Sequence, residues 1–194
     1  MLIFTQGKRR GSEHVNQDNL ERTAKLFCQA INYRVLRPAL AQLAKDDLTE
    51  VQLSCLRYTH LHQDPSVGEI AEGLKISNAA SAKLIDRLVR KHLLTREEDP
   101  VDRRVLKIKL TPDGDRLLAE ITRVETEQFQ KIFGSMADDE RQALEKGLVG
   151  FLTKSVENAE QLDEICLRCG WSHDIDCAGN QLYKNFTSKD KAKV

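Results

Sequence analysis

The sequence has few aromatic residues, little glycine or proline, and no excess of charge of either sign. Aromatic residues make up 5% of the 194 residues, with 10 glycines and 4 prolines, a composition typical of a mainly helical globular protein. No stretch approaches the roughly 18 consecutive apolar residues of a membrane-spanning helix. The 30 basic and 30 acidic residues cancel, which excludes a uniformly basic nucleic-acid coat but still allows a local basic surface.

Targeting signals and enzyme motifs are also absent from the sequence. The chain begins MLIF, only four apolar residues, whereas a secretory signal peptide needs about 7–15 in its central region. We therefore expect a cytoplasmic protein whose cysteines are reduced, metal-bound or redox-active rather than joined in structural disulfides. A glycine-rich phosphate loop, a nucleophile elbow and a helical histidine–glutamate metal motif are all missing, so we expect no enzymatic activity.

The length of the chain fits one domain with a small appendage. Polar residues 1–17 predict a flexible arm, residues 18–157 a main domain, and residues 158–194 a cysteine-rich C-terminal extension. Residues 20–45 and 115–157 carry apolar stripes at helical spacing. The apolar surface of these stripes exceeds what a single small winged helix can cover. We expect these helices to join two copies of the chain, with Pro38 kinking the first of them.

Local capping signals mark the starts of the central helices. Thr49 followed by Gln52, and Ser66 followed by Glu69, fit the capping box in which each side chain bonds the other's backbone N–H. Ser77 is the expected N-cap of the next helix. The two short helices that start at Ser66 and Ser77 predict a helix-turn-helix, a pattern that is weak evidence of DNA binding by itself.

A charged hairpin follows these helices directly. Residues 93–96 and 105–110 read as two short strands around a turn at 97–102, and Thr111-Pro112 reads as the start of another helix. A helix-turn-helix followed by such a hairpin is a winged helix, here about residues 49–110. Its second helix enters the major groove of DNA, and its wing reaches the backbone or minor groove.

The charge is concentrated on this predicted element. Between Lys75 and Lys109 there are ten basic residues and five acidic ones, a local excess of positive charge in a neutral chain. Neutralisation of phosphates dominates affinity for duplex DNA, so a basic patch is the expected footprint of such a protein.

Several motifs, in order, resemble the multiple-antibiotic-resistance regulator (MarR) family. They are LKISNAASAKLIDRL at 74–88, KHLLTR at 91–96, DPVDRR at 99–104 and LTPDG at 110–114. The resemblance covers about residues 20–155. It implies a mainly α fold, a winged helix-turn-helix with long N- and C-terminal dimerisation helices and a two-stranded wing. It also implies a homodimer on a pseudo-palindromic double-stranded DNA operator, acting as a repressor in transcription regulation.

The resemblance also implies which residues meet DNA. Recognition-helix positions would read the major groove, Arg87 would lie nearer phosphate, and Arg104 would enter the minor groove while Asp102 holds the wing. The full set of expected DNA-binding residues is Ser77, Asn78, Ala79, Lys83, Arg87, Asp102, Arg103 and Arg104. Alanines at 79, 80 and 82 depart from the hydroxyl or proline residues usual there, so base reading rests on few polar groups. The family's small phenolic or lipophilic effectors bind between the dimerisation helices and the winged helix.

The C-terminal extension contains a possible ligand set for a metal. Cys166, Cys169, His173 and Cys177 have the spacing C-x2-C-x3-H-x3-C, and three thiolates with one imidazole are a complete tetrahedral set for zinc. The pattern resembles a retroviral-type zinc knuckle shortened by one residue in each gap. An iron–sulfur cluster on the three cysteines is the rival interpretation, and a reversible disulfide between Cys166 and Cys169 is a third. Cys28 and Cys55, among apolar residues, are expected to be buried.

The sequence therefore predicts a DNA-binding transcription regulator that responds to a metal or redox signal or to a small ligand. Two alternatives stay open. One is an interaction adaptor that uses a zinc-knuckle-like tail, and the other is a regulator of a phenolic ligand whose tail is purely structural.

Overall fold

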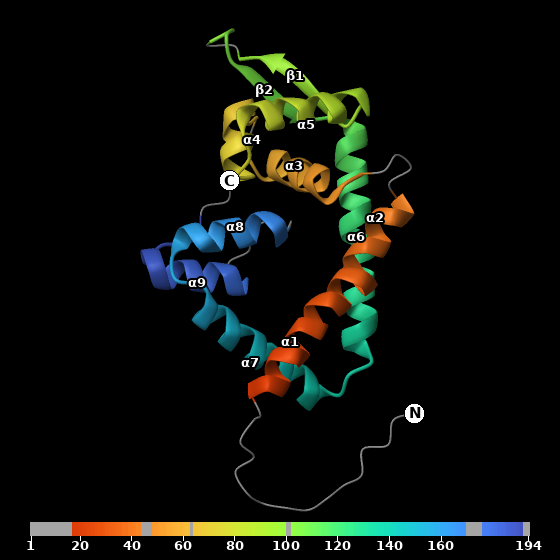
Figure 1. Ribbon diagram of the computed structural model, residues 1–194, viewed down its shortest axis with the longest axis vertical. Helices are drawn as coiled ribbons and strands as arrows, with labels where there is room; N and C mark the ends of the chain where they lie inside the picture. Colours follow the sequence, from red (N-terminus) through yellow and green to blue (C-terminus); the bar gives the residue numbers. More distant parts are fainter. Residues whose placement is uncertain (1–16, 44–47, 63, 100–101, 170–175, 192–194) are drawn as a thin grey trace, which may run out of the picture.

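A computed structural model describes residues 17–43, 48–62, 64–99, 102–169 and 176–191. The elements, in chain order, are α1 (Gln17–Ile31), the π-helical turn η1 (Asn32–Leu36), α2 (Arg37–Leu43), α3 (Glu50–Leu61), α4 (Val67–Gly73), α5 (Asn78–Arg90), β1 (Leu94–Glu98), β2 (Leu106–Leu110), α6 (Pro112–Gly134), α7 (Asp138–Ser155), α8 (Ala159–Cys169) and α9 (Ala178–Thr187). The prediction of a mainly α winged helix-turn-helix is confirmed (Figure 1). Within the described residues, no helix is long and apolar enough to cross a membrane.

The predicted helix starts are found where the capping signals lie. The Thr49 hydroxyl accepts the Gln52 N–H at 3.3 Å, and the Gln52 side chain accepts the Thr49 N–H at 3.1 Å. Ser66 and Glu69 make the same reciprocal pair at 3.2 and 2.7 Å. Each box satisfies backbone donors that the first helical turn leaves free, so the chain enters α3 and α4 at defined residues.

One hydrophobic core holds the winged helix together. Leu56 of α3, Ile70 of α4, Ile85 and Leu88 of α5, and Ile108 of β2 are all fully buried in it. Their burial from four elements fixes α5 beneath the hairpin, as Figure 1 shows. The same core continues to α6, so the long helix is packed against the winged helix rather than tethered to it.

The wing is longer than the sequence predicts. β1 and β2 are antiparallel, with Leu94 opposite Leu110 and Glu98 opposite Leu106. The turn was expected to begin at Glu97, but the strand continues through Glu98. Glu97 lies opposite Lys107 and forms an ion pair with Lys109 at 2.8 Å, so opposite charges across the strands favour continued pairing.

The start of α6 is pressed against the end of α5. The Thr111 hydroxyl donates to the His92 carbonyl at 2.6 Å, and the Thr111 N–H donates to the Leu93 carbonyl at 3.1 Å. A Cβ at Gly114 would lie 2.2 Å from the same Leu93 oxygen, so only glycine fits there. The long helix α6 and the wing therefore meet at a close backbone contact.

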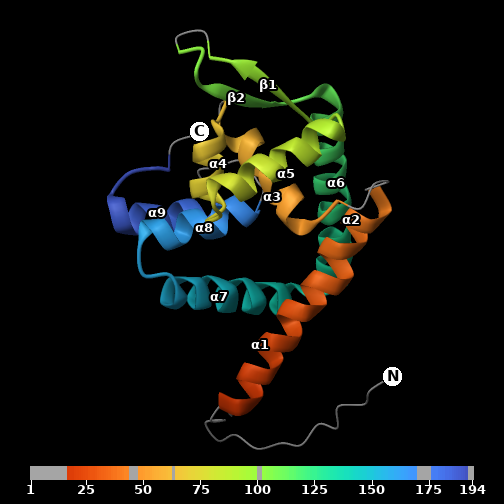
Figure 2. The same ribbon diagram turned by 45° about the horizontal axis from the view of Figure 1, so that its top comes forward.

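The N-terminal helices run on continuously through Pro38. A π-helical turn precedes the proline, with the Arg37 N–H donating to the Asn32 carbonyl. Because Pro38 has no N–H, the wider turn ahead of it adjusts the helix instead of ending it. α1 has no buried residue and projects away from the winged helix (Figures 1 and 2).

The C-terminal extension contains two helices that the sequence did not predict. α8 and α9 pack on each other around Val156, Leu162 and Leu182, which form a second small core. α8 also contacts α3, so the pair is seated beside the winged helix (Figure 2). α8 carries Leu162, Ile165 and Cys166 at helical spacing, so a local signal for this helix is present in the sequence although no helix was predicted there.

Candidate nucleic-acid interface

The turn between α4 and α5 depends on backbone positions with special requirements. A Cβ at Gly73 would lie 2.0 Å from the Tyr58 ring, so glycine allows the ring to cover the end of α4. Lys75 has a φ of 54°, in the left-handed region. The Ile76 N–H returns to the Ala71 carbonyl at 2.9 Å and closes the turn. The direction in which α5 leaves α4 is therefore fixed by local geometry.

One face of α5 is anchored in the protein. Ser81 is fully buried, and its hydroxyl donates to the Val67 carbonyl of α4 at 3.0 Å. Leu84, Ile85 and Leu88 continue the buried face. Sequence reasoning missed Ser81, although a small polar residue four positions after an N-cap serine, in phase with the apolar stripe, was the available signal. Its hydrogen bond ties the recognition helix directly to its neighbour.

The opposite face of α5 holds the residues expected to read DNA. The structure places five of them on this exposed face or at its start: Ser77, Asn78, Ala79, Lys83 and Arg87. The Ser77 oxygen accepts the Ala80 N–H at 3.2 Å, so this residue caps the helix. Its hydroxyl proton is still a donor that a base edge or a phosphate can accept.

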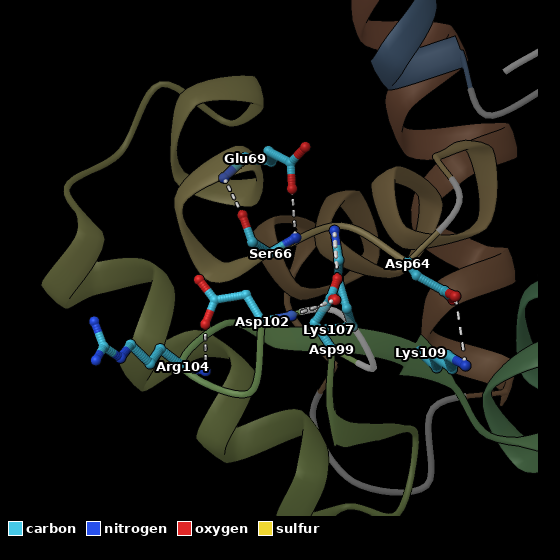
Figure 3. Close-up of polar contacts among 8 residues, drawn as sticks. All are labelled: Asp64, Ser66, Glu69, Asp99, Asp102, Arg104, Lys107 and Lys109. Atoms are coloured by element: carbon cyan, nitrogen blue, oxygen red, sulfur yellow. Dashed lines mark hydrogen bonds and ion pairs between the residues drawn. The ribbon is translucent and has the colours of Figure 1, made fainter.

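The tip of the wing is shaped by two aspartates. The Asp102 carboxylate accepts the Arg104 N–H at 3.0 Å, and the Asp102 N–H donates to the Asp99 carboxylate at 3.1 Å. Figure 3 shows the Arg104 side chain extending away from Asp102. Arg103 and Arg104 are both exposed. The contact is consistent with the predicted role of Asp102 in holding the wing while Arg104 reaches outward.

The base of the wing is tied to the connection before α4. The Ile108 N–H donates to the Pro65 carbonyl at 2.9 Å, and Lys109 pairs with Asp64 at 3.4 Å (Figure 3). The wing is therefore held at its base from the helix-turn-helix side, and only its tip extends beyond the fold.

Acidic partners divide nine of the ten basic residues between Lys75 and Lys109 into two groups. Four of the ten lie in ion pairs with acidic side chains: Lys75, Arg96, Lys107 and Lys109. Five more are exposed and take part in none of the ion pairs found within the described residues: Lys83, Arg87, Arg90, Arg103 and Arg104. The second group belongs to the outer face of α5 and the tip of the wing. The positive charge open to phosphates is thus concentrated on the two elements that a winged helix presents to DNA.

A cavity of about 380 Å³ lies between the N-terminal helices, α6 and the winged helix. Its lining includes Leu36 and Leu40 from the N-terminal helices and Lys75 from the turn before α5. Arg57 and Glu125 also line it and form an ion pair at 2.7 Å, with 9% and 8% of their side chains exposed. Burial raises the pKa of Glu125, against the opposing effect of Arg57. Sequence reasoning missed this pair, whose partners are 68 residues apart.

The tail cysteines converge on one glycine. A Cβ at Gly179 would lie 3.3 Å from the Cys166 sulfur and 3.5 Å from the Cys177 sulfur. The Gly179 N–H donates to the Cys177 sulfur at 3.3 Å, and Cys177 is the N-cap of α9. Burial raises the pKa of Cys166, while a hydrogen bond from Lys191 acts in the opposite direction. Cys169 and Cys177 are exposed.

The predicted metal centre is only partly covered by the structure. His173 lies outside the described residues. Within them, no group of three or more His, Cys, Asp or Glu side chains is arranged to hold a metal ion. The zinc or iron–sulfur site at Cys166, Cys169, His173 and Cys177 therefore stays a prediction.

The other two cysteines differ from each other. Cys55 is buried, as predicted, and burial raises its pKa to about 12. The prediction that Cys28 is buried is wrong for the single chain, because Cys28 is exposed on α1, a helix with no buried residue in the part of the chain that the structure describes.

Comparison with known proteins agrees with this geometry. The family model described as MarR family matches residues 48–106. Two Bacillus subtilis relatives are similar: the uncharacterized HTH-type transcriptional regulator YsmB, 31% identical over 53% of this chain and 70% of the relative, and the HTH-type transcriptional repressor MdtR, 32% identical over 54% and 67%. Among solved structures, an S. aureus MepR F27L mutant bound to an oligodeoxyribonucleotide aligns with a TM-score of 0.56 at 23% identity, over 70% of this chain and 96% of that one.

Proposed function

This chain belongs to the MarR family of DNA-binding transcriptional regulators, and from that premise we propose that it is a cytoplasmic repressor that binds a pseudo-palindromic operator as a homodimer. Members of the family are regulators and not enzymes. The single observation that supports the DNA-binding mode is the concentration of unpaired positive charge on the outer face of α5 and the tip of the wing. The relative MdtR is a transcriptional repressor, which supports the direction of regulation.

The proposed dimer is supported by apolar side chains that the single chain leaves exposed. Leu26 of α1 is 70% exposed and Phe151 of α7 is 65% exposed. Neither helix has a buried residue within the described chain. Helices of this length gain most of their stability from packing an apolar face, so a second copy is the partner that these two faces favour. Sedimentation at micromolar concentration should give a dimer, and a monomer would contradict this proposal.

Selection from random duplex DNA identifies the operator and tests the proposed function. The full-length protein, reduced with dithiothreitol, is incubated with a pool of random duplex DNA, and the bound sequences are enriched and sequenced. Enrichment of an inverted repeat whose half-sites are about 10 base pairs apart supports the proposal. If the protein enriches no sequence, or binds all duplexes equally, it is not a sequence-specific regulator. The alternative of an interaction adaptor with a zinc-knuckle-like tail would then be the better interpretation.

Two variants locate the interface on the enriched duplex. Lys83→Ala and Arg104→Ala should each weaken binding by about 1–3 kcal/mol if they contact base edges, as direct base contacts do. Lys146→Ala on α7 removes the same charge far from α5 and the wing, and it should bind like the wild type. Equal affinity of all three variants and the wild type would show that the interface is elsewhere.

The signal for this regulator has two candidate sites. The cavity beside Arg57 lies between the proposed dimerisation helices and the winged helix, which is where the family binds small effectors. We propose that this cavity binds a small apolar molecule whose anionic group pairs with Arg37, another residue of its lining. The second candidate is a metal ion or iron–sulfur cluster at Cys166, Cys169, His173 and Cys177. Metal analysis and a visible absorption spectrum of anaerobically purified protein test it directly.

A further inference from the structure

α8 contacts the turn of the helix-turn-helix through two acidic residues. The Lys75 ammonium lies 3.2 Å from the Glu160 carboxylate and 3.3 Å from that of Glu164. The two glutamates are four residues apart and so share one face of α8. Lys75 itself is the left-handed residue of the turn that sets the direction of α5. The C-terminal extension therefore touches the DNA-reading element at the residue that orients it.

A second set of contacts joins the same two regions through α3. The His62 ring stacks on Tyr58 with centroids 4.0 Å apart, and Tyr58 covers Gly73 at the end of α4. Burial and the nearby Lys191 ammonium lower the pKa of His62, while Asp163 acts in the opposite direction. His62 thus lies close to side chains from α8 and from the chain after α9. α3 also contacts α8 directly, so the tail is joined to the winged helix through α3 as well as through Lys75.

The thiols lie at the end of the same helix. Cys166 follows Glu164 by two residues, and its sulfur and that of Cys177 flank Gly179 from α8 and α9. Lys191 hydrogen-bonds the Cys166 sulfur and pairs with Asp163 of α8. Cys177 is the more exposed of the two thiols, so it is the one placed to meet an oxidant from solution first. Of the described residues, Cys166 and Cys177 both bring their sulfurs close to the position of a Gly179 Cβ, so they are a pair of thiols placed to form a disulfide.

We propose that Cys166 and Cys177 form a reversible disulfide that controls the hold of α8 on the helix-turn-helix, and thereby the affinity for DNA. This inference rests on the proposed function. The oxidant is a hydroperoxide: one thiolate attacks the peroxide, the O–O bond breaks, and sulfenic acid and an alcohol or water form. The second thiol then attacks the sulfenic sulfur, the S–S bond forms, and water leaves.

Closing this disulfide requires movement. The two sulfurs are unbonded and lie 3.3 and 3.5 Å from the position that a Cβ of Gly179 would take, whereas a disulfide holds them about 2.05 Å apart. In the proposed switch, closing the bond draws the end of α8 toward α9 and away from the turn. Glu164, half a helical turn before Cys166, loses its place beside Lys75. The start of α5 is then less firmly held, so oxidation lowers DNA affinity.

The test uses the full-length protein and the duplex enriched by its reduced form. Hydrogen peroxide treatment should lower the intact mass by 2 Da per disulfide, and a non-reducing peptide map should join Cys166 to Cys177. Fluorescence anisotropy should show affinity falling at least about fivefold, at the lower end of usual allosteric coupling, and returning with dithiothreitol. Cys166→Ser and Cys177→Ser should abolish the change, while Cys28→Ser, which removes an exposed thiol from α1, should retain it.

A charge variant tests separately whether the disulfide forms and whether its effect reaches the DNA-binding element. The double variant Glu160→Gln, Glu164→Gln should still form the disulfide, but peroxide should change its DNA affinity less than about twofold. The matched control Asp139→Asn, Glu145→Gln removes two exposed acids from α7 and should respond like the wild type. A full response in the Glu160/Glu164 variant would overturn transmission through Lys75.

Three further outcomes would overturn the proposal. They are a disulfide that uses Cys169 in place of either partner, unchanged affinity after the Cys166–Cys177 bond has formed, and stoichiometric metal that protects the thiols from peroxide. Failure of the reduced protein to enrich any duplex counts against the proposed function instead. The two failures are distinguishable because the mass and peptide map report the disulfide without DNA.

Discussion

Arg96 of β1 holds Asp86 of α5 at 2.6 Å, so the wing and the recognition helix are joined by a direct ion pair. The same guanidinium reaches the Ala82 carbonyl at 3.5 Å, one turn earlier on α5. The pair lies at the surface, with 31% of Arg96 and 50% of Asp86 exposed, so its contribution to folding stability is small. Its consequence is geometric, because it joins the two elements that we propose enter neighbouring grooves of DNA.

Breaking this pair should affect DNA recognition more than stability. Asp86→Asn removes the charge that holds Arg96, and we expect the ratio of specific to non-specific DNA affinity to fall. The free energy of unfolding should change by no more than about 1 kcal/mol. Anisotropy on matched and scrambled duplexes and urea denaturation measure the two quantities. Glu98→Gln removes an exposed acid from β1, the strand that carries Arg96, and is the control for lost negative charge. This control should keep the wild-type ratio of specific to non-specific affinity.

The role of Asp102 can be tested by the sign of the effect. Loss of a negative charge near DNA should by itself strengthen binding to phosphates. If Asp102 instead holds the wing through the Arg104 N–H, Asp102→Ala should weaken binding, as Arg104→Ala does. Operator affinity measured at several salt concentrations separates the cases. Tighter binding by Asp102→Ala would mean that its carboxylate only repels DNA.

The buried pair at the cavity should be important for stability. Arg57→Ala leaves the Glu125 carboxylate without the nearby guanidinium, which typically costs about 3–5 kcal/mol for a buried pair. Denaturant unfolding should show this loss. Glu127→Ala, an exposed residue half a turn from Glu125, should lower stability by less than about 1 kcal/mol. Equal losses in the two variants would mean that the pair is not a special feature of the core.

The capping box of α4 should contribute to the pH dependence of stability. The Ser66 backbone N–H, together with its hydroxyl, lowers the pKa of Glu69 below its ordinary value of 4.5. A depressed folded pKa stabilises the protein above the unfolded pKa, and this contribution is lost as the pH falls through the folded value. Glu69→Gln should therefore lose less stability than the wild type when the pH falls below about 4.5. Identical acid unfolding curves would show that the box does not carry this charge effect.

The cysteines should differ in reactivity. Burial raises the pKa of Cys55 to about 12, so iodoacetamide at pH 8 should leave it unmodified in the folded protein. Cys169 and Cys177 are exposed and should react first. Peptide mass spectrometry at increasing times measures the order, and urea-unfolded protein is the control in which all five should react. Early modification of Cys55 in the folded protein would contradict its burial.

The features that the sequence predicts well are those determined within a few residues. The starts of α3 and α4 follow from capping pairs three residues apart, and the wing follows from two short apolar segments with a charged turn. The end of the β1 strand was missed because it depends on pairing between Glu97 and the lysines of β2, across the hairpin.

Contacts between distant segments could not be predicted in this way. The Lys75–Glu160 pair joins residues 85 apart, and both are common surface residue types with nothing in the local pattern to connect them. The cysteine spacing identified the tail as chemically special, but the seat of α8 against the turn depends on the folded core beneath it. Pairwise geometry of this kind needs the tertiary structure.

The close contact of Gly114 with the Leu93 carbonyl should make the spacing of the two wings in the proposed dimer rigid. Because no flexible joint separates α6 from the wing, the crossing angle of the dimerisation helices sets the distance and the relative rotation of the two wings. One added base pair between half-sites rotates the second site by about 35° about the DNA axis, since a turn is about 10–10.5 base pairs. The protein can follow that rotation only by bending the DNA or repacking the dimer, so operator spacing should be as discriminating as operator sequence.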